Sequence, residues 1–288
     1  MKAKAYTPSD SGGDVYTVHY NSVQETTATA WDHEAIHDHN ATMRNSYLAD
    51  FKGELYNGSK NWFGGYSMDS MREALINPPA CAAEVESLKT EVETDAITSR
   101  ERRAIVRRQA DGDEFDAAAW VRRDLDGWSR VTRKKVHGRL VRIAVNVACL
   151  CNRNREDLYY RGAAAVALSD ILELSGYSVE LTAVACSHKV KRNNFGRTYI
   201  QSITIKPADS PLDIASAALV CSEIGFWRGV MLPARMASLD GQIRDHLGCT
   251  RQLPNRFRQQ YDIVLDDGIF SRADALAEVN KWANKFTC

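Results

Sequence analysis

The chain has 288 residues, 44% of them hydrophobic, with 37 basic and 37 acidic side chains. This length and apolar content indicate one large or two small domains with an ample core. No run of about 18 apolar residues is present, which argues against a membrane-spanning helix. The N-terminus also has no apolar stretch of the kind found in a signal peptide.

Seven cysteines, an odd number with no C-x-x-C pair, predict buried thiols in a reducing compartment rather than disulfides or a zinc site. We therefore expect a cytoplasmic protein without a cofactor. The neutral total charge hides an asymmetry, because residues 1–98 carry 7 Lys or Arg against 15 Asp or Glu, and residues 99–258 carry 27 against 17. The asymmetry indicates either a polyanion-binding middle behind an acidic front, or an unevenly charged solvated surface.

The first 50 residues predict a polar, partly disordered segment, followed by a single α/β domain over residues 51–288 with its core at 140–240. Within that segment, residues 16–20 have the composition of a short strand. Residues 33–37 match H-E-x-x-H, in which His33 and His37 would share a zinc ion from one helix face. The flanking aspartates make this stretch too polar for a buried active-site helix, and no downstream ligand pattern follows, although His39 is near. We favour a surface helix.

Residues 51–79 are dense in aromatic residues and glycines. The aromatics either stack on nucleic-acid bases or, as we favour, fasten a loop-rich extension to the core. A short helix is predicted from the cap Ser67 to the Pro78-Pro79 pair. Residues 80–108 predict a long helix, acidic at its start and basic at its end. The densest basic cluster, residues 129–139, follows Trp128.

The segment Leu140–Lys206 is the predicted core. Val141, Ile143 and Val145 alternate along a strand whose other face is small or polar. A helix ends at Gly176, and two strands follow at 177–185 and 198–206. This order predicts a parallel crossover unit, with the last strand pairing as a hairpin on the second. A helix near Pro211, a strand at 261–265 and a C-terminal helix capped by Ser271 complete a mixed sheet flanked by helices.

The stretch VRIAVNVACLCNRNREDLYYRGAAAVALSDILELSGYSVELTAVAC resembles the first half of a von Willebrand factor A domain. Metal-binding members of that family carry Asp-x-Ser-x-Ser where this chain has Asn146, Ala148 and Leu150, so the resemblance implies a metal-free relative with an irregular N-terminal extension. Over residues 60–240 the chain also resembles a family of phage-encoded proteins with R-G-A-A-x-x-A-L and G-Y-x-V-E-L motifs. It resembles as well the single-stranded-DNA-binding transcription regulators of podophages that carry a giant virion RNA polymerase.

Ligands of open α/β sheets bind beyond the carboxyl ends of the parallel strands. The loops predicted there, 151–161 and 187–197, are basic and contain aromatic residues. Cations there, Arg161 among them, would neutralise phosphates and aromatics would stack on bases, although Tyr159 and Tyr160 could instead begin a helix and pack in the core. The candidate nucleic-acid-binding residues are Arg133, Lys134, Lys135, Arg153, Arg155, Tyr159, Lys189, Lys191, Arg192, Phe195 and Arg197.

We therefore expect a non-catalytic, homo-oligomeric single-stranded-DNA-binding protein of phage transcription, with a phage RNA polymerase as a candidate partner. A protein-interaction scaffold with the same metal-free fold is the main alternative. An enzyme is less favoured because the chain has no phosphate-binding, dinucleotide-binding or nucleophile-elbow motif, which leaves a zinc hydrolase built on residues 33–37 as the minor alternative.

Overall fold

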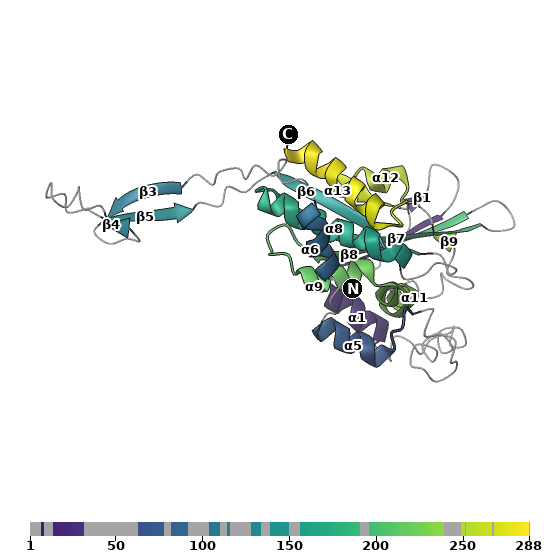
Figure 1. Ribbon diagram of the computed structural model, residues 1–288. Helices are drawn as coiled ribbons and strands as arrows, with labels where there is room; N and C mark the ends of the chain where they lie inside the picture. Colours follow the sequence, from purple (N-terminus) through teal and green to yellow (C-terminus); the bar gives the residue numbers. More distant parts are fainter. Residues whose placement is uncertain are drawn as a thin grey trace.

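A mixed seven-stranded β-sheet lies at the centre of the fold, and helices cover it (Figure 1). The computed structural model describes residues 7–8, 14–31, 63–77, 82–91, 104–109, 114–115, 128–133, 139–149, 156–190, 196–238, 249–250, 252–266 and 268–287. The predicted α/β class with a mixed sheet is confirmed.

The strand order of this sheet is β1-β2-β8-β7-β6-β10, and β9 also pairs with β7. β6 runs parallel to both β7 and β10, β2 runs parallel to β8, and β7 and β8 are antiparallel. The strands are β1 (Thr7–Pro8), β2 (Asp14–Tyr20), β6 (Leu140–Asn146), β7 (Ser178–Val190), β8 (Gly196–Lys206), β9 (Cys249–Thr250) and β10 (Ile263–Leu265).

The predicted crossover unit and hairpin are both confirmed. Helix α8 (Glu156–Leu174) joins the parallel strands β6 and β7. Gly176 follows it with a φ of 90°, which an L side chain rarely adopts, so glycine suits the turn that ends the helix. β8 returns as the antiparallel partner of β7.

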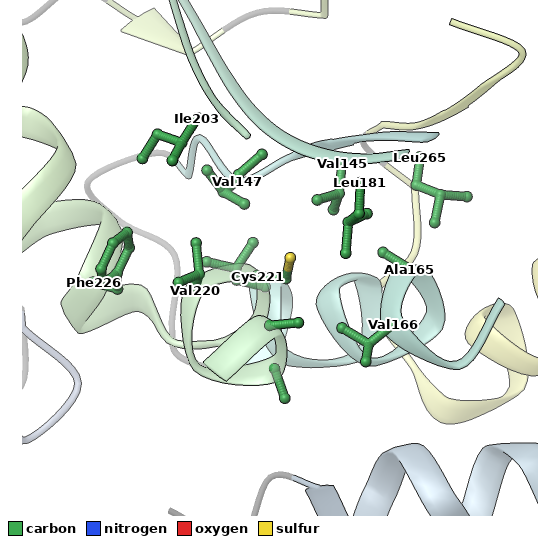
Figure 2. Close-up of a cluster of buried hydrophobic side chains, with 14 of the residues drawn as sticks. Val145, Val147, Ala165, Val166, Leu181, Ile203, Val220, Cys221, Phe226 and Leu265 are labelled. Carbon is green, nitrogen blue, oxygen red and sulfur yellow. The ribbon is translucent and has the colours of Figure 1, made fainter. Parts of the chain in front are cut away.

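The main core lies between the sheet and its helices. Val145 and Leu181 point from the strands toward Ala165 and Val166 of α8, as Figure 2 shows. The opposite face of β6 is small, and there Ala144 packs with Leu253 and a half-buried Phe257. The alternation read from the sequence thus separates two layers, one built on α8 and one built on the segment that contains α12 (Asn255–Arg258).

The helices that share the main core come from across the chain. α8 packs against α6, α9 and α13, and α1 packs against η2 and α11. Besides α8 they are α1 (Val23–Trp31), α5 (Met68–Ile76), α6 (Ala82–Glu91), α9 (Ile214–Ser222), α10 (Ile224–Phe226), the π-helix η2 (Trp227–Met231), α11 (Leu232–Ser238) and α13 (Arg272–Thr287).

Two predicted helix caps are confirmed. At the start of α5 the Ser67 hydroxyl accepts from the Ser70 amide at 3.2 Å, and the Ser70 hydroxyl accepts from the Ser67 amide at 2.7 Å. At the start of α13 the Ser271 hydroxyl accepts from the Asp274 amide at 3.2 Å, and the Asp274 carboxylate accepts from the Ser271 amide at 3.0 Å. Each reciprocal pair satisfies amides that the first helical turn leaves without a partner.

Part of the first 50 residues is built into the main fold. β2, which includes the strand predicted at 16–20, pairs with β8 over seven residues. The Tyr20 phenol is buried and donates to the Ala234 carbonyl at 2.8 Å, which ties β2 to α11. Burial raises the pKa of Tyr20 to about 12. Phe63 is likewise buried in the main core, as expected for an aromatic that fastens the extension.

The prediction of one helix over residues 80–108 is wrong at its C-terminal end. Helix α6 ends at Glu91, and residues 104–109 form strand β3 (Ala104–Gln109). With β5 (Trp128–Arg133) and β4 (Glu114–Phe115), β3 forms a second, antiparallel sheet in the order β3-β5-β4. The β-branched pair Ile105-Val106 favours a strand once a partner strand is present. In Figure 1 this three-stranded sheet projects away from the main body.

Within the residues described, no single helix is long and apolar enough to cross a membrane. One bent pair of segments, Ile214–Ser222 and Ile224–Arg235, has the required length and composition but turns by 68° between its halves.

Candidate nucleic-acid interface

The β7–β8 hairpin extends past the end of β6. β6 pairs with β7 only as far as Asn146 opposite Val184, whereas β7 continues to Val190, opposite Gly196 of β8. The short β9 pairs with β7 at Ser187 and His188, along the edge of β7 that pairs with β6 farther back in the strand. The hairpin therefore reaches beyond the carboxyl end of β6, where open α/β sheets bind their ligands.

Two of the predicted cations occupy paired positions on this extension. Lys189 of β7 lies in register with Arg197 of β8, and Asp14 of β2 is the next residue in the same row. The remaining predicted residues of this hairpin, Lys191, Arg192 and Phe195, are in the connection 191–195, outside the described residues.

The Arg197 side chain is half-buried, with its guanidinium carbon 5.8 Å from the centre of the Tyr16 ring. Tyr16 stacks in turn on Tyr199, with ring centres 5.5 Å apart and planes inclined by 22°. Both tyrosines are buried. They support the base of the hairpin as a packed aromatic pair, and the cation above them is held by a cation–π contact.

A buried arginine that the sequence analysis missed contacts the same part of β7. Arg235 of α11 is 1% exposed and donates from Nη1 to the Ser187 hydroxyl at 2.8 Å. Its guanidinium carbon is 5.4 Å from the centre of the Trp227 ring and 6.0 Å from that of Tyr199. The signal in the sequence was a pair of arginines, Arg228 and Arg235, seven residues apart inside an otherwise apolar stretch. Both are buried, and Arg235 contacts β7 through Ser187.

The entry to α8 differs from the predicted loop. The described helix begins at Glu156, so Tyr159 and Arg161 are helical. Tyr159 is half-buried, packs on the core and meets Tyr160 edge to face at 5.4 Å, which matches the alternative in which these tyrosines begin a helix. The expectation that Arg161 contacts phosphate is wrong, because the first helical turns carry it into the interior, where it is 1% exposed. Arg153 and Arg155 lie outside the described residues.

The third group of predicted cations lies at the end of the three-stranded sheet. Arg133 is the last residue of β5 and is opposite Ala104 of β3. Lys134 and Lys135 follow it outside the described residues. The candidate residues thus divide among the hairpin, the approach to α8 and the three-stranded sheet.

A polar network closes the carboxyl ends of β6 and β10. Asn146 donates from Nδ2 to Asp266 at 2.6 Å, and its Oδ1 accepts from the Ala148 amide at 3.1 Å. Arg258 of α12 donates to the other oxygen of Asp266 at 2.6 Å. Asp266 is 8% exposed, so the ion pair compensates a largely desolvated carboxylate. The Asn146 amide thus fastens the ends of β6 and β10 together.

No group of three or more His, Cys, Asp or Glu side chains placed to hold a metal ion occurs among the residues that the structure describes. The H-E-x-x-H stretch with His33, His37 and His39 lies outside them. Three cysteines that are described, Cys149, Cys186 and Cys221, are buried.

A family model for a domain of unknown function (DUF7192) matches residues 3–287. The chain belongs to this family. The match spans both the three-stranded sheet and the main sheet. Searches of the curated proteins and of the solved structures found no match.

The opposite end of β8 borders a cavity of about 730 Å³. Its walls are mainly apolar and include Val23, Leu75 and Ile205. Its buried cation, Lys206, is already engaged, donating to Glu173 at 2.5 Å and to the Val179 carbonyl at 2.7 Å.

Proposed function

We propose that this protein is a non-catalytic single-stranded-DNA-binding protein that acts in phage transcription in the host cytoplasm, as a homo-oligomer that assists an RNA polymerase. The observation that carries the proposal is the register of the β7–β8 extension. This register pairs Lys189 with Arg197 near the end of the two strands. The connection that follows contains Lys191, Arg192 and Phe195.

The electrostatic argument rests on this concentration of charge. Lys189 and Arg197 occupy paired positions on neighbouring strands, and Asp14 is next in the same row. Like charges at such positions are destabilising, and a phosphate backbone that binds there adds negative charge and releases counterions. The extension also stands at the carboxyl end of β6, the edge where sheets of this kind bind ligands.

Single strands are favoured over duplex by the chemistry of the connection. Phe195 is flanked by Asn, Gly and basic residues with no apolar neighbour in sequence, so an unpaired base is a suitable stacking partner. The chain has no motif that reads a duplex groove. The polymerase partner is supported by the resemblance to the phage regulators and by the acidic residues 1–98, which complement a basic surface on another protein.

The test compares two triple variants with the same change in charge. K189A/K191A/R192A removes the hairpin cations, whereas the control R72A/K281A/K285A removes three cations from α5 and α13. Fluorescence anisotropy with a labelled 30-nucleotide poly-dT measures the dissociation constant between 50 and 300 mM NaCl. Loss of three phosphate contacts lowers the slope of log affinity against log salt by about 2. Equal affinities and slopes for the two variants would contradict the proposal.

One observation favours the alternative of a protein-interaction scaffold. Ile76, at the end of α5, is 75% exposed beside the apolar cavity. An exposed aliphatic at the rim of an apolar hollow is a common feature of protein contacts. If I76D abolishes self-association or capture of an RNA polymerase while poly-dT binding is unchanged, the two activities use separate surfaces.

A further inference from the structure

The register of the three-stranded sheet brings basic and aromatic residues together. Arg107 of β3 is directly opposite Arg130 of β5. In the next row on the same side, Trp128 of β5 lies between Gln109 of β3 and Phe115 of β4. Strand residues alternate between the two faces, so one face carries both rows. We call it the Arg–aromatic face, comprising Ile105, Arg107, Gln109, Phe115, Trp128, Arg130 and Thr132.

The other face of the same strands has a different pattern. Arg108 lies in one row with Ser129 and Glu114, so an acid shares its row. Val106 is opposite Val131, and no aromatic residue occupies a paired position on this face. The contrast between neighbours is sharp, because Arg107 and Arg108 are adjacent in β3 and yet belong to opposite faces.

The register of the Arg–aromatic face matches the chemistry of a single strand of nucleic acid. Positions 107 and 130 are directly opposite each other and both hold arginine, and like charges at such positions are disfavoured unless an anion is near. In Figure 1 these strands project from the main body. A ligand that supplies negative charge to this row and a flat apolar surface to the next row, about 7 Å along the strands, suits both.

We propose that the Arg–aromatic face is a second binding surface for single-stranded nucleic acid. Bases stack at the Trp128–Phe115 row, and the phosphates of the same strand are neutralised at the Arg107–Arg130 row. This inference rests on the proposed function, because it adds a second contact for the strand that the β7–β8 extension holds. It assigns a role to Trp128 and to two arginines that the hairpin does not use.

Three single variants separate the parts of this surface, measured by anisotropy with the same labelled 30-nucleotide poly-dT between 50 and 300 mM NaCl. R107T removes one phosphate contact and lowers the salt slope by about 0.7, whereas R108T, its neighbour on the other face, leaves the slope unchanged. W128L weakens binding on the order of tenfold at every salt concentration without changing the slope, because stacking involves no counterion release. Threonine keeps the strand propensity, and circular dichroism verifies that each variant is folded.

The outcomes distinguish this inference from the proposed function. If R107T and R108T have equal slopes, or if W128L binds as the unaltered protein does, the second surface is overturned. If in addition K189A/K191A/R192A still weakens binding, the proposed function stands without it. If the unaltered protein does not bind poly-dT at 50 mM NaCl, both are overturned.

Discussion

Replacing Gly162 with alanine tests how closely α8 and α9 pack. An ideal Cβ at residue 162 would lie 2.3 Å from both the carbonyl carbon and the carbonyl oxygen of Cys221, and 2.5 Å from the Ser222 hydroxyl. Ordinary contacts of a Cβ are 3.4–4 Å. Because two of the three atoms are backbone, the helices must separate by about 1 Å, and rotation of a side chain cannot relieve the overlap.

Two opposing effects decide whether G162A raises or lowers the free energy of unfolding. Alanine is favoured over glycine in a helix by about 1 kcal/mol. Overpacking a dense core costs about 1–3 kcal/mol and occasionally more, and a clash against backbone belongs at the upper end. We expect G162A to lower the free energy of unfolding by about 2 kcal/mol, which corresponds to a fall in Tm of roughly 4–8 °C for a chain of this size.

Thermal unfolding followed by circular dichroism, with urea unfolding at 25 °C, measures the effect. Gly225 is the comparison, because two of the three atoms nearest a Cβ there belong to side chains. They are a Tyr66 ring carbon at 2.6 Å and the end of Met71, which can move, at 3.0 Å. The third is the Phe63 carbonyl oxygen at 2.7 Å. G225A should therefore destabilise less than G162A. A Tm of G162A equal to or above that of the unaltered protein would mean that helix propensity outweighs the contact, and would refute the reasoning.

Three further predictions concern buried polar groups. Burial raises the pKa of Tyr20 from 10.0 to about 12. As the pH rises from 10 to 12 the unfolded chain therefore loses the Tyr20 proton before the folded protein does, and the free energy of unfolding falls. The Tm of Y20F should fall less steeply over that pH range than the Tm of the unaltered protein, and identical slopes would contradict this prediction. N146D places a second carboxylate beside Asp266, where Asn146 now donates at 2.6 Å, and should destabilise the fold by about 2 kcal/mol at pH 7. Because protonating one of the two carboxylates removes this repulsion, the deficit should shrink in acid, and a pH-independent deficit would count against the network. K206M leaves Glu173 and the buried Val179 carbonyl without their donor and should cost about 2–3 kcal/mol in urea unfolding, whereas unchanged stability would show that the buried ion pair contributes nothing.

The core of the fold was predictable because its signals are local. Alternation along β6 identified Val141, Ile143 and Val145 as core residues, and they are buried in the main cluster. Ser67 and Ser271 predicted helix starts because a capping hydroxyl acts within three residues. Order and spacing of the segments were sufficient to predict the parallel crossover and the hairpin.

The errors came from partners distant in sequence. Residues 104–109 have a basic composition compatible with the end of a helix, but they pair with residues 128–133, and such a pairing has no local signal. Arg161 was assigned to the basic loop predicted at residues 151–161, yet α8 begins at Glu156 and carries it inward. The sequence likewise did not predict the close approach of Gly162 to Cys221 or the buried position of Arg235, since each depends on helices that meet only in the folded chain.

The central claim is that this protein binds single-stranded DNA through the cations of its sheet edge. The most direct test is the affinity of the unaltered, full-length protein for a 30-nucleotide poly-dT and for a 30-base-pair duplex, titrated by anisotropy between 50 and 300 mM NaCl. We expect tighter binding to poly-dT than to duplex at each salt concentration, with log affinity falling linearly against log salt. Equal affinity for the two probes would show a general polyanion surface, and no binding of poly-dT at 50 mM NaCl would contradict the proposed function.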